Sequence, residues 1–289
     1  MITLKRIFPL LCLIIILLAG CAEKSKAQIV ATTLPVYEFT AYICEGTGII
    51  VDRLITENVS CLHDYTLQVK QTKKIEAADL IVVSGAGLED FLSDILSDEK
   101  DKIIATGIEN EECHEYDQDH EHHHETDPHL WLSCSHAIEM CENIYNGLVE
   151  HYPQHEDTFE KNKLLLIQKI DEFNNYAKKA LNDITNRDII TFHDGFHYLA
   201  SEYNLNIIKA IEEESGSEAS AKELTEIILL IKKHNIKAIF VEANGSASAA
   251  SIIARECNIP IYTLDMAMSG DSWFEAMRKN IDTLKEALQ

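Results

Sequence analysis

The chain has 289 residues, with 25 lysines and arginines against 48 aspartates and glutamates, which gives a net charge of −23 at pH 7. This acidic excess argues against a nucleic acid as partner, because phosphate backbones are bound by basic surfaces. The length is sufficient for one large domain or for two lobes of ordinary size, each with a core.

The first 20 residues have the pattern of a secretory signal peptide. Two basic residues precede an apolar run over 7–19, and this run of about 13 residues is shorter than the roughly 20 that a membrane-spanning helix needs. The run ends in Leu-Ala-Gly-Cys, which resembles a bacterial lipobox, so we expect cleavage before Cys21 and lipidation of its thiol. Residues 21–28 would then be a lipidated tether, which anchors an extracytoplasmic protein to the bacterial cell membrane. An ordinary signal peptide or one membrane-spanning helix is the alternative.

Residues 29–150 alternate between short apolar runs and amphipathic patterns. Such an alternation of strand and helix predicts a parallel sheet covered by helices, and hence a first α/β lobe. The expected strands and helices are, in chain order, 29–33, 35–46, 49–51, 67–78 and 80–83.

Segment 113–127 of this lobe is an acidic loop rich in histidine. It has no apolar face, so we expect it to be solvated. We predict weak, rapidly exchanging metal binding there, with an inert hydrophilic loop as the alternative. Part of the loop matches the H-E-x-x-H pattern of zinc proteases, but that motif requires a helix, which Pro128 and the polar surroundings disfavour. The histidines are His114, His120, His122, His123 and His124.

Residues 151–184 are predicted to form a stiff connecting helix. The part over 156–183 contains no Gly or Pro and repeats apolar residues at helical spacing, and at about 1.5 Å per residue it would extend roughly 40 Å. A second alternation over 185–289 predicts a second α/β lobe. Its expected strands are 189–192, 207–208, 238–241 and 261–264, and its expected helices are 194–203, 220–234 and 246–257.

Four isolated metal-ligand residues follow strand-like runs. His63, His129, His193 and Asp265 lie roughly 65 to 70 residues apart, which is too far for a local metal finger. A shared site would have to be built between two lobes, where the carboxyl ends of parallel strands face a crevice. His197 is an alternative to His193, since it lies four residues on, on the same helical face. Each residue alone is more often a surface or packing residue, so the prediction depends on all four.

The cysteines match no zinc knuckle and include no Cys-x-x-Cys pair, which disfavours redox catalysis. Disulfides are permitted outside the cytoplasm, but the sequence leaves their pairing open. Cys61 and Cys134 flank His63 and His129, so a bridge near the site, or a thiol near the metal, is one alternative. Besides Cys21, the mature chain contains Cys44, Cys61, Cys113, Cys134, Cys141 and Cys257.

Several blocks of the sequence, together with the lipobox, resemble one family. They are similar to the zinc and manganese solute-binding lipoproteins of bacterial ABC importers, of the ZnuA/TroA type, and the resemblance covers essentially all of residues 21–289. The blocks that carry it are DPHLWLS at 127–133, TFHDGFHYLA at 191–200, AIFVE at 238–242 and TLD at 263–265.

The resemblance implies an α/β fold of two lobes, each a parallel sheet flanked by helices, joined by one long rigid helix. It places the metal between the lobes, held by His63 and His129 from the first lobe and by His193 and Asp265 from the second. It also implies delivery of the ion to a membrane permease and its ATPase, although it does not say which permease. We expect a monomer that is not an enzyme, because capture and release break no covalent bond.

Ligand chemistry favours zinc as the ion. Three imidazoles and one carboxylate suit Zn²⁺, whereas Mn²⁺ favours more oxygen ligands. In the family, the position of His193 tends to be His in zinc binders and Glu in many manganese binders. A manganese-specific or broad-specificity binding protein is the first alternative. A secreted zinc-dependent hydrolase with Glu242 as general base is another, although four protein ligands leave no position for water. An adhesin is a third.

Overall fold

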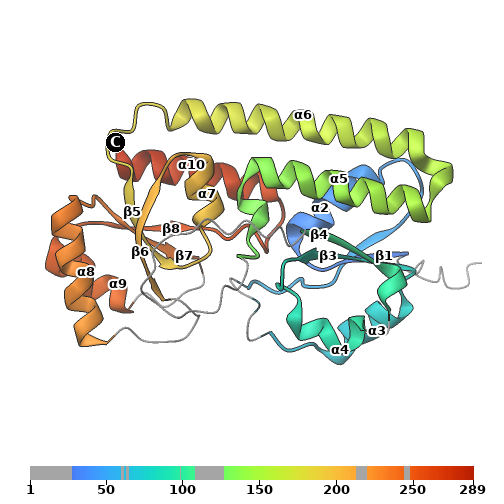
Figure 1. Ribbon diagram of the computed structural model, residues 1–289, viewed down its shortest axis with the longest axis horizontal. Helices are drawn as coiled ribbons and strands as arrows, with labels where there is room; N and C mark the ends of the chain where they lie inside the picture. Colours follow the sequence, from blue (N-terminus) through green and yellow to red (C-terminus); the bar gives the residue numbers. More distant parts are fainter. Residues whose placement is uncertain are drawn as a thin grey trace, which may run out of the picture.

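The computed structural model describes residues 28–59, 62, 65–97, 99–107, 127–212, 220–243 and 248–289. In this part of the chain, two α/β lobes lie side by side, and the long helix α6 (Glu156–Ala180) runs along both (Figure 1). The predicted signal peptide, Cys21, Cys61, His63 and the five histidines of the loop 113–127 lie outside the described residues. No helix among the described residues is both long and apolar enough to cross a membrane.

The first lobe is built on a parallel sheet whose four strands are β1 (Ile29–Ala31), β2 (Val51–Arg53), β3 (Leu80–Gly85) and β4 (Ile103–Gly107). Their order is β2-β1-β3-β4. Strands β1 and β3 consist almost wholly of buried residues, because helices cover both faces of the sheet. The helices are α2 (Leu34–Ile43) and α5 (Cys134–His151) on one face, and α3 (Val69–Ala77) and α4 (Ser93–Leu96) on the other (Figure 1).

The second lobe repeats this plan with the strands β5 (Asp188–His193), β6 (Asn206–Glu212), β7 (Ile239–Glu242) and β8 (Ile261–Leu264). All neighbours are parallel, in the order β6-β5-β7-β8. The helices are α7 (His197–Glu202) and α10 (Trp273–Leu288) on the face toward α6, and α8 (Ala221–His234) and α9 (Ser248–Cys257) on the opposite face (Figure 1).

One hydrophobic core joins the two lobes. It runs from the first sheet through α6 to α7 and α10, whereas the residues between the second sheet and α8 and α9 form a smaller, separate cluster. Trp273, at the start of α10, packs edge-on against Phe39 of α2 at 5.2 Å between ring centroids, and lies 6.0 Å from Phe173 of α6. The side of the second lobe that carries α7 and α10 is therefore held against the first lobe by buried apolar surface.

The predicted fold class is confirmed: two parallel sheets are flanked by helices and bridged by one long helix. The strand expected at 49–51 is instead β2 at Val51–Arg53, whose residues are half-buried, as befits a strand at the edge of the sheet. Helix α6 begins only at Glu156, because a 3-10 turn at Pro153–His155 precedes it. Strand β4 and the helices α4, α5 and α10 were not predicted.

Candidate metal centre

His129 lies at the start of a short 3-10 turn, η4 (Leu130–Leu132), whose three residues are buried. The Oδ1 atom of Asp127 accepts a hydrogen bond from the backbone N–H of His129 at 3.0 Å and lies 2.8 Å from its Nδ1 atom. Because Nδ1 faces a carboxylate, the imidazole carries its proton there and presents the lone pair of Nε2. That Nε2 atom is buried and has no hydrogen-bond partner among the described residues, which fits an atom reserved for a metal ion.

The charge of Asp127 supports this arrangement. Burial raises the pKa of its carboxyl, but hydrogen bonds with His129 outweigh the burial and hold the pKa below its ordinary value. A carboxylate behind a histidine ligand fixes the orientation of the ring and makes the opposite nitrogen more basic. The Asp-Pro-His block is visible in the sequence, but this role of its first residue was not predicted.

His193 closes β5 and brings a second imidazole to the same place. Both rings are only 3% exposed, their centroids are 5.3 Å apart and their planes are almost perpendicular, at 89°. His129 comes from the first lobe and His193 from the second. The structure therefore brings together two of the four predicted ligands, one from each lobe.

Gly195 marks the point where the two rings converge. A Cβ atom built on Gly195 would lie 2.8 Å from Cδ2 of His193, 2.9 Å from Cε1 of His129 and 2.6 Å from Cε of Met266. In an imidazole, both Cδ2 and Cε1 are bonded to Nε2. The Nε2 sides of the two rings therefore border the small space that the missing side chain leaves.

Asp265 follows β8 and is held in place through its backbone. Its N–H donates to Oδ1 of Asn280 at 2.7 Å, and its carbonyl accepts from Nδ2 of Asn280 at 2.7 Å. Its own Oδ1 atom accepts from the N–H of Ala267 at 2.8 Å. Asp265 precedes Met266, whose methyl group borders the space between the imidazoles. Asp265 thus belongs to the segment that walls this space.

Within the described ranges, no three side chains of His, Cys, Asp or Glu gather closely enough to hold an ion. His63 lies outside these ranges, so the assembly of all four ligands stays a prediction. His197, the alternative to His193, is 52% exposed, and its Nε2 atom lies 2.7 Å from Asp194 Oδ1. The hydrogen bond with Asp194 raises the pKa of His197, which disfavours the neutral ring that a metal requires.

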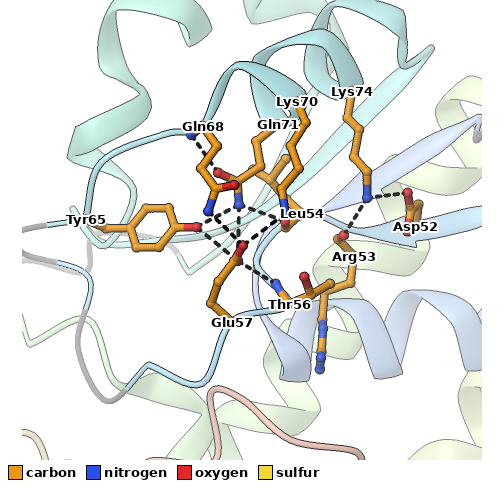
Figure 2. Close-up of polar contacts among 10 residues, drawn as sticks. All are labelled: Asp52, Arg53, Leu54, Thr56, Glu57, Tyr65, Gln68, Lys70, Gln71 and Lys74. Atoms are coloured by element: carbon orange, nitrogen blue, oxygen red, sulfur yellow. Dashed lines mark hydrogen bonds and ion pairs between the residues drawn. The ribbon is translucent and has the colours of Figure 1, made fainter.

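The residues on either side of His63 are tied to α3 by one carboxylate (Figure 2). Glu57 accepts hydrogen bonds from the Tyr65 hydroxyl at 3.1 Å and from three side chains at the start of α3. Leu62 is fully buried in the core of the lobe, and its carbonyl accepts from the N–H of Tyr65 at 3.0 Å. The three partners from α3 are Gln68, Lys70 and Gln71.

The cysteines show no sign of metal chemistry in the part of the chain that the structure describes. Cys44, Cys134, Cys141 and Cys257 are free thiols. Cys134, which the sequence placed near the site, has its sulfur 3.4 Å from the hydroxyl of Tyr203. Burial raises the pKa of Cys134 to about 12, so it stays a neutral thiol and is a poor ligand.

Glu202 of α7 joins the two lobes behind the imidazoles, and sequence reasoning missed it. Its carboxylate accepts hydrogen bonds from the hydroxyls of Ser133 and Ser135 at the start of α5, each at 2.7 Å, and from Asn174 of α6 at 3.0 Å. Lys178 of α6 lies 3.7 Å away. Burial alone raises the pKa of Glu202, but these hydrogen bonds outweigh it and lower the pKa. The carboxylate therefore stays charged.

Two α/β lobes fastened by a long helix, with one buried imidazole from each lobe meeting at their interface, define a bilobal solute-binding protein. The chain belongs to the family described as zinc-uptake complex component A, periplasmic, and matches it over residues 29–287. This confirms the resemblance identified in the sequence. The family is one of uptake components and not of enzymes, which agrees with the predicted absence of catalysis.

The relatives that the chain resembles carry zinc in their names. The zinc-binding lipoprotein AdcA of Streptococcus pneumoniae is 32% identical over 93% of this chain and 58% of its own length. The zinc-binding protein AdcA of Streptococcus pyogenes is 30% identical over 91% of this chain and 56% of its own length. The chain thus spans little more than half the length of the AdcA relatives. The high-affinity zinc uptake system protein ZnuA of Bacillus subtilis is 28% identical, with 94% of each chain covered.

Solved structures share the fold. The Zn(II)-bound ZnuA-like domain of Streptococcus pneumoniae AdcA is 30% identical and superposes with a TM-score of 0.74, covering 91% of this chain and 99% of that domain. The laminin-binding protein of Streptococcus agalactiae, with 24% identity and a TM-score of 0.74, covers 90% of this chain and 99% of its own. At that lower identity, the likeness concerns the fold alone.

Proposed function

We propose that this chain captures one zinc ion between its lobes and delivers it to a membrane permease, as the binding component of an ABC importer. The observation that carries the proposal is the buried Nε2 atom of His129, which has no hydrogen-bond partner in the described part of the chain and belongs to a ring beside that of His193 at the lobe interface. An unpartnered buried nitrogen destabilises the folded protein by about 1–3 kcal/mol. A bound ion would remove that penalty.

In this proposal, His129 and His193 are two ligands and His63 and Asp265 complete the set. Nitrogen donors in a dry, closed site favour Zn²⁺ over Mn²⁺, which prefers oxygen ligands and binds more weakly to most sites. The zinc-binding names of the AdcA and ZnuA relatives support the same ion. Manganese binding is the alternative that a direct competition must decide.

Each supporting residue has a separate task. Asp127 orients His129 through Nδ1. Asn280 holds the backbone of Asp265 through hydrogen bonds with both its N–H and its carbonyl. The imidazoles must be neutral to bind, so zinc affinity falls as the pH drops through the range in which histidine titrates. Protonation therefore offers one route to release.

The anchoring and partners belong to the same proposal. A lipid on Cys21 would hold the protein at the outer surface of the cell membrane as a monomer, within reach of the permease and its ATPase. The acidic loop with His114, His120, His122, His123 and His124 would bind metal weakly, raising its concentration near the site. The word lipoprotein in the name of one AdcA relative supports the anchor.

The test is a metal titration of metal-free residues 22–289 by calorimetry in the presence of a competing chelator. We expect one tight zinc site, which His129→Ala and His193→Ala each weaken by at least about a hundredfold. The matched control is His151→Ala, at the opposite end of α5, where the ring nitrogens lie 2.8 and 3.2 Å from the backbone carbonyls of Gly147 and Asp101. Unchanged affinity in the first two variants would refute the site, and tighter binding of Mn²⁺ than of Zn²⁺ would refute the choice of ion.

A further inference from the structure

The space between the two imidazoles has an apolar wall. The methyl carbon of Met266 and the two ring carbons of His129 and His193 all lie within 2.9 Å of a single point, the place where a Cβ atom of Gly195 would be. Gly195 needs to be glycine for this reason, since its side chain would collide with all three groups at once. The thioether methyl and one Nε2-bonded carbon of each ring therefore surround the same point.

This methyl group belongs to a segment that is fixed. Met266 is 2% exposed, and its carbonyl accepts a hydrogen bond from Nε1 of Trp131 at 2.6 Å. The next two residues, Ala267 and Met268, are fully buried, and the carbonyl of Met268 accepts from the N–H of Leu34 at 3.2 Å. This segment of the second lobe is thus held against the first lobe by two hydrogen bonds.

A wall at this position limits how many ligands an ion can have. Zn²⁺ is satisfied by four ligands in a tetrahedral arrangement. Ions such as Mn²⁺ favour six and usually keep water among them. Because the methyl group and a carbon of each ring already crowd this position, an added water would have no room there, and carbon cannot replace water as a ligand.

We infer that Met266 and Gly195 together act as a size filter, which makes the site selective for an ion that accepts four ligands. The inference rests on the proposed function, because it assigns selectivity to the same site. The preference for zinc then comes partly from Met266, which is not a ligand, and partly from the chemistry of the ligands. Met266 is thus a specificity-determining residue whose contribution comes from its volume and not from its sulfur.

The test measures the ratio of Zn²⁺ to Mn²⁺ affinity by competition calorimetry, with native mass spectrometry for stoichiometry and circular dichroism for folding. Met266→Ala opens the wall, so we expect the ratio to fall by at least about tenfold, chiefly through tighter Mn²⁺ binding. Met266→Leu retains the volume without the sulfur and should keep the ratio within about twofold. Gly195→Ala fills the same space from the other side and should weaken zinc by about 10 to 100-fold in a folded protein.

The outcomes separate this inference from the proposed function. A wild-type protein without any tight metal site would refute the proposed function itself. A wild-type protein with a tight zinc site and an unchanged metal ratio in Met266→Ala would refute the filter alone. An equal shift in Met266→Leu would identify the sulfur as a ligand and overturn the inference. If Met266→Ala does not fold, Gly195→Ala decides, because unchanged zinc affinity in that variant would mean that the space is not restricted.

Discussion

Trp131 donates a hydrogen bond from its indole Nε1 atom to the carbonyl of Met266 at 2.6 Å, although 135 residues separate the two in the sequence. The carbonyl of Trp131 in turn accepts from Nε1 of Trp273 at 2.9 Å. The turn that follows His129 is thereby locked to the residue that follows Asp265. The hydrogen bond from Trp131 to Met266 thus links the segments of two predicted ligands across the lobe interface.

Replacing Trp131 by Phe should uncouple these two ligands. The variant leaves the buried Met266 carbonyl without its donor, so we expect a loss of about 1–3 kcal/mol in unfolding free energy, with weaker zinc binding. Trp273→Phe removes the companion bond to Trp131 and serves as the control. Urea unfolding and zinc titration of both variants should show similar destabilisation but weaker zinc binding only in Trp131→Phe. Equal zinc affinity in the two would contradict the coupling.

Asp127→Asn should weaken zinc binding by about 10 to 100-fold while the fold remains intact. The amide keeps the size of the side chain but loses the charge that orients His129 and raises the basicity of Nε2. The control is Asp194→Asn, which removes the charge of the exposed carboxylate that faces His197. Competition titration with a chelator measures both affinities, and a larger effect from Asp194→Asn would favour His197 as the ligand.

The stabilising effect of the Glu202 carboxylate should depend on pH. Its hydrogen bonds lower the pKa in the folded state, so the stability they contribute is fully present above the ordinary pKa of glutamate, about 4.3. This stability is lost as the pH falls through the lower folded value. Glu202→Gln should therefore be less stable than the wild type by about 1–3 kcal/mol at neutral pH, with the difference shrinking as the pH falls below the ordinary pKa of glutamate.

Urea unfolding at a series of pH values measures this difference. Glu172→Gln is the matched control, since that exposed carboxylate accepts from Gln168 on its own helix. A stability difference for Glu202→Gln that is the same at all pH values would show that the charge does not matter.

Tyr65 should affect zinc binding without touching the ion. Its hydroxyl donates to Glu57, and this bond ties the chain after His63 to the start of α3 (Figure 2). Provided that His63 is a ligand, Tyr65→Phe should weaken zinc by up to about tenfold. Lys70→Met is the control, because it removes another partner of the same Glu57 from an exposed position. Titration of both variants should show a loss only in Tyr65→Phe, and identical affinities would count against a role of this segment.

The fold could be predicted from hydrophobic pattern because both sheets are parallel and buried. Strands such as β3 and β5 then appear as short continuous apolar runs between amphipathic helices. Strand β2 was misplaced because Ile50, in the expected run, is 37% exposed at the sheet edge. Helix α10 carried a readable signal that was not used, since Trp273, Met277 and Ile281 recur at intervals of four residues and are fully buried.

The site could be predicted only in part. His193 could be predicted, because a histidine at the carboxyl end of a parallel strand faces a crevice. The orienting role of Asp127 could have been read from its spacing to His129. The contributions of Glu202 and Met266 could not, because each depends on residues that only the folded chain brings together. The lobe interface, and not any local motif, creates those contacts.

The proposed function requires that zinc binds to Nε2 of His129 and of His193 between the lobes. The most direct measurement is a crystal structure of the zinc-loaded protein with anomalous scattering recorded at the zinc absorption edge. We expect one strong peak between these two rings, bounded by Gly195 and the methyl group of Met266. A structure in which zinc is found only on the acidic histidine-rich loop, with the two rings unligated, would contradict it.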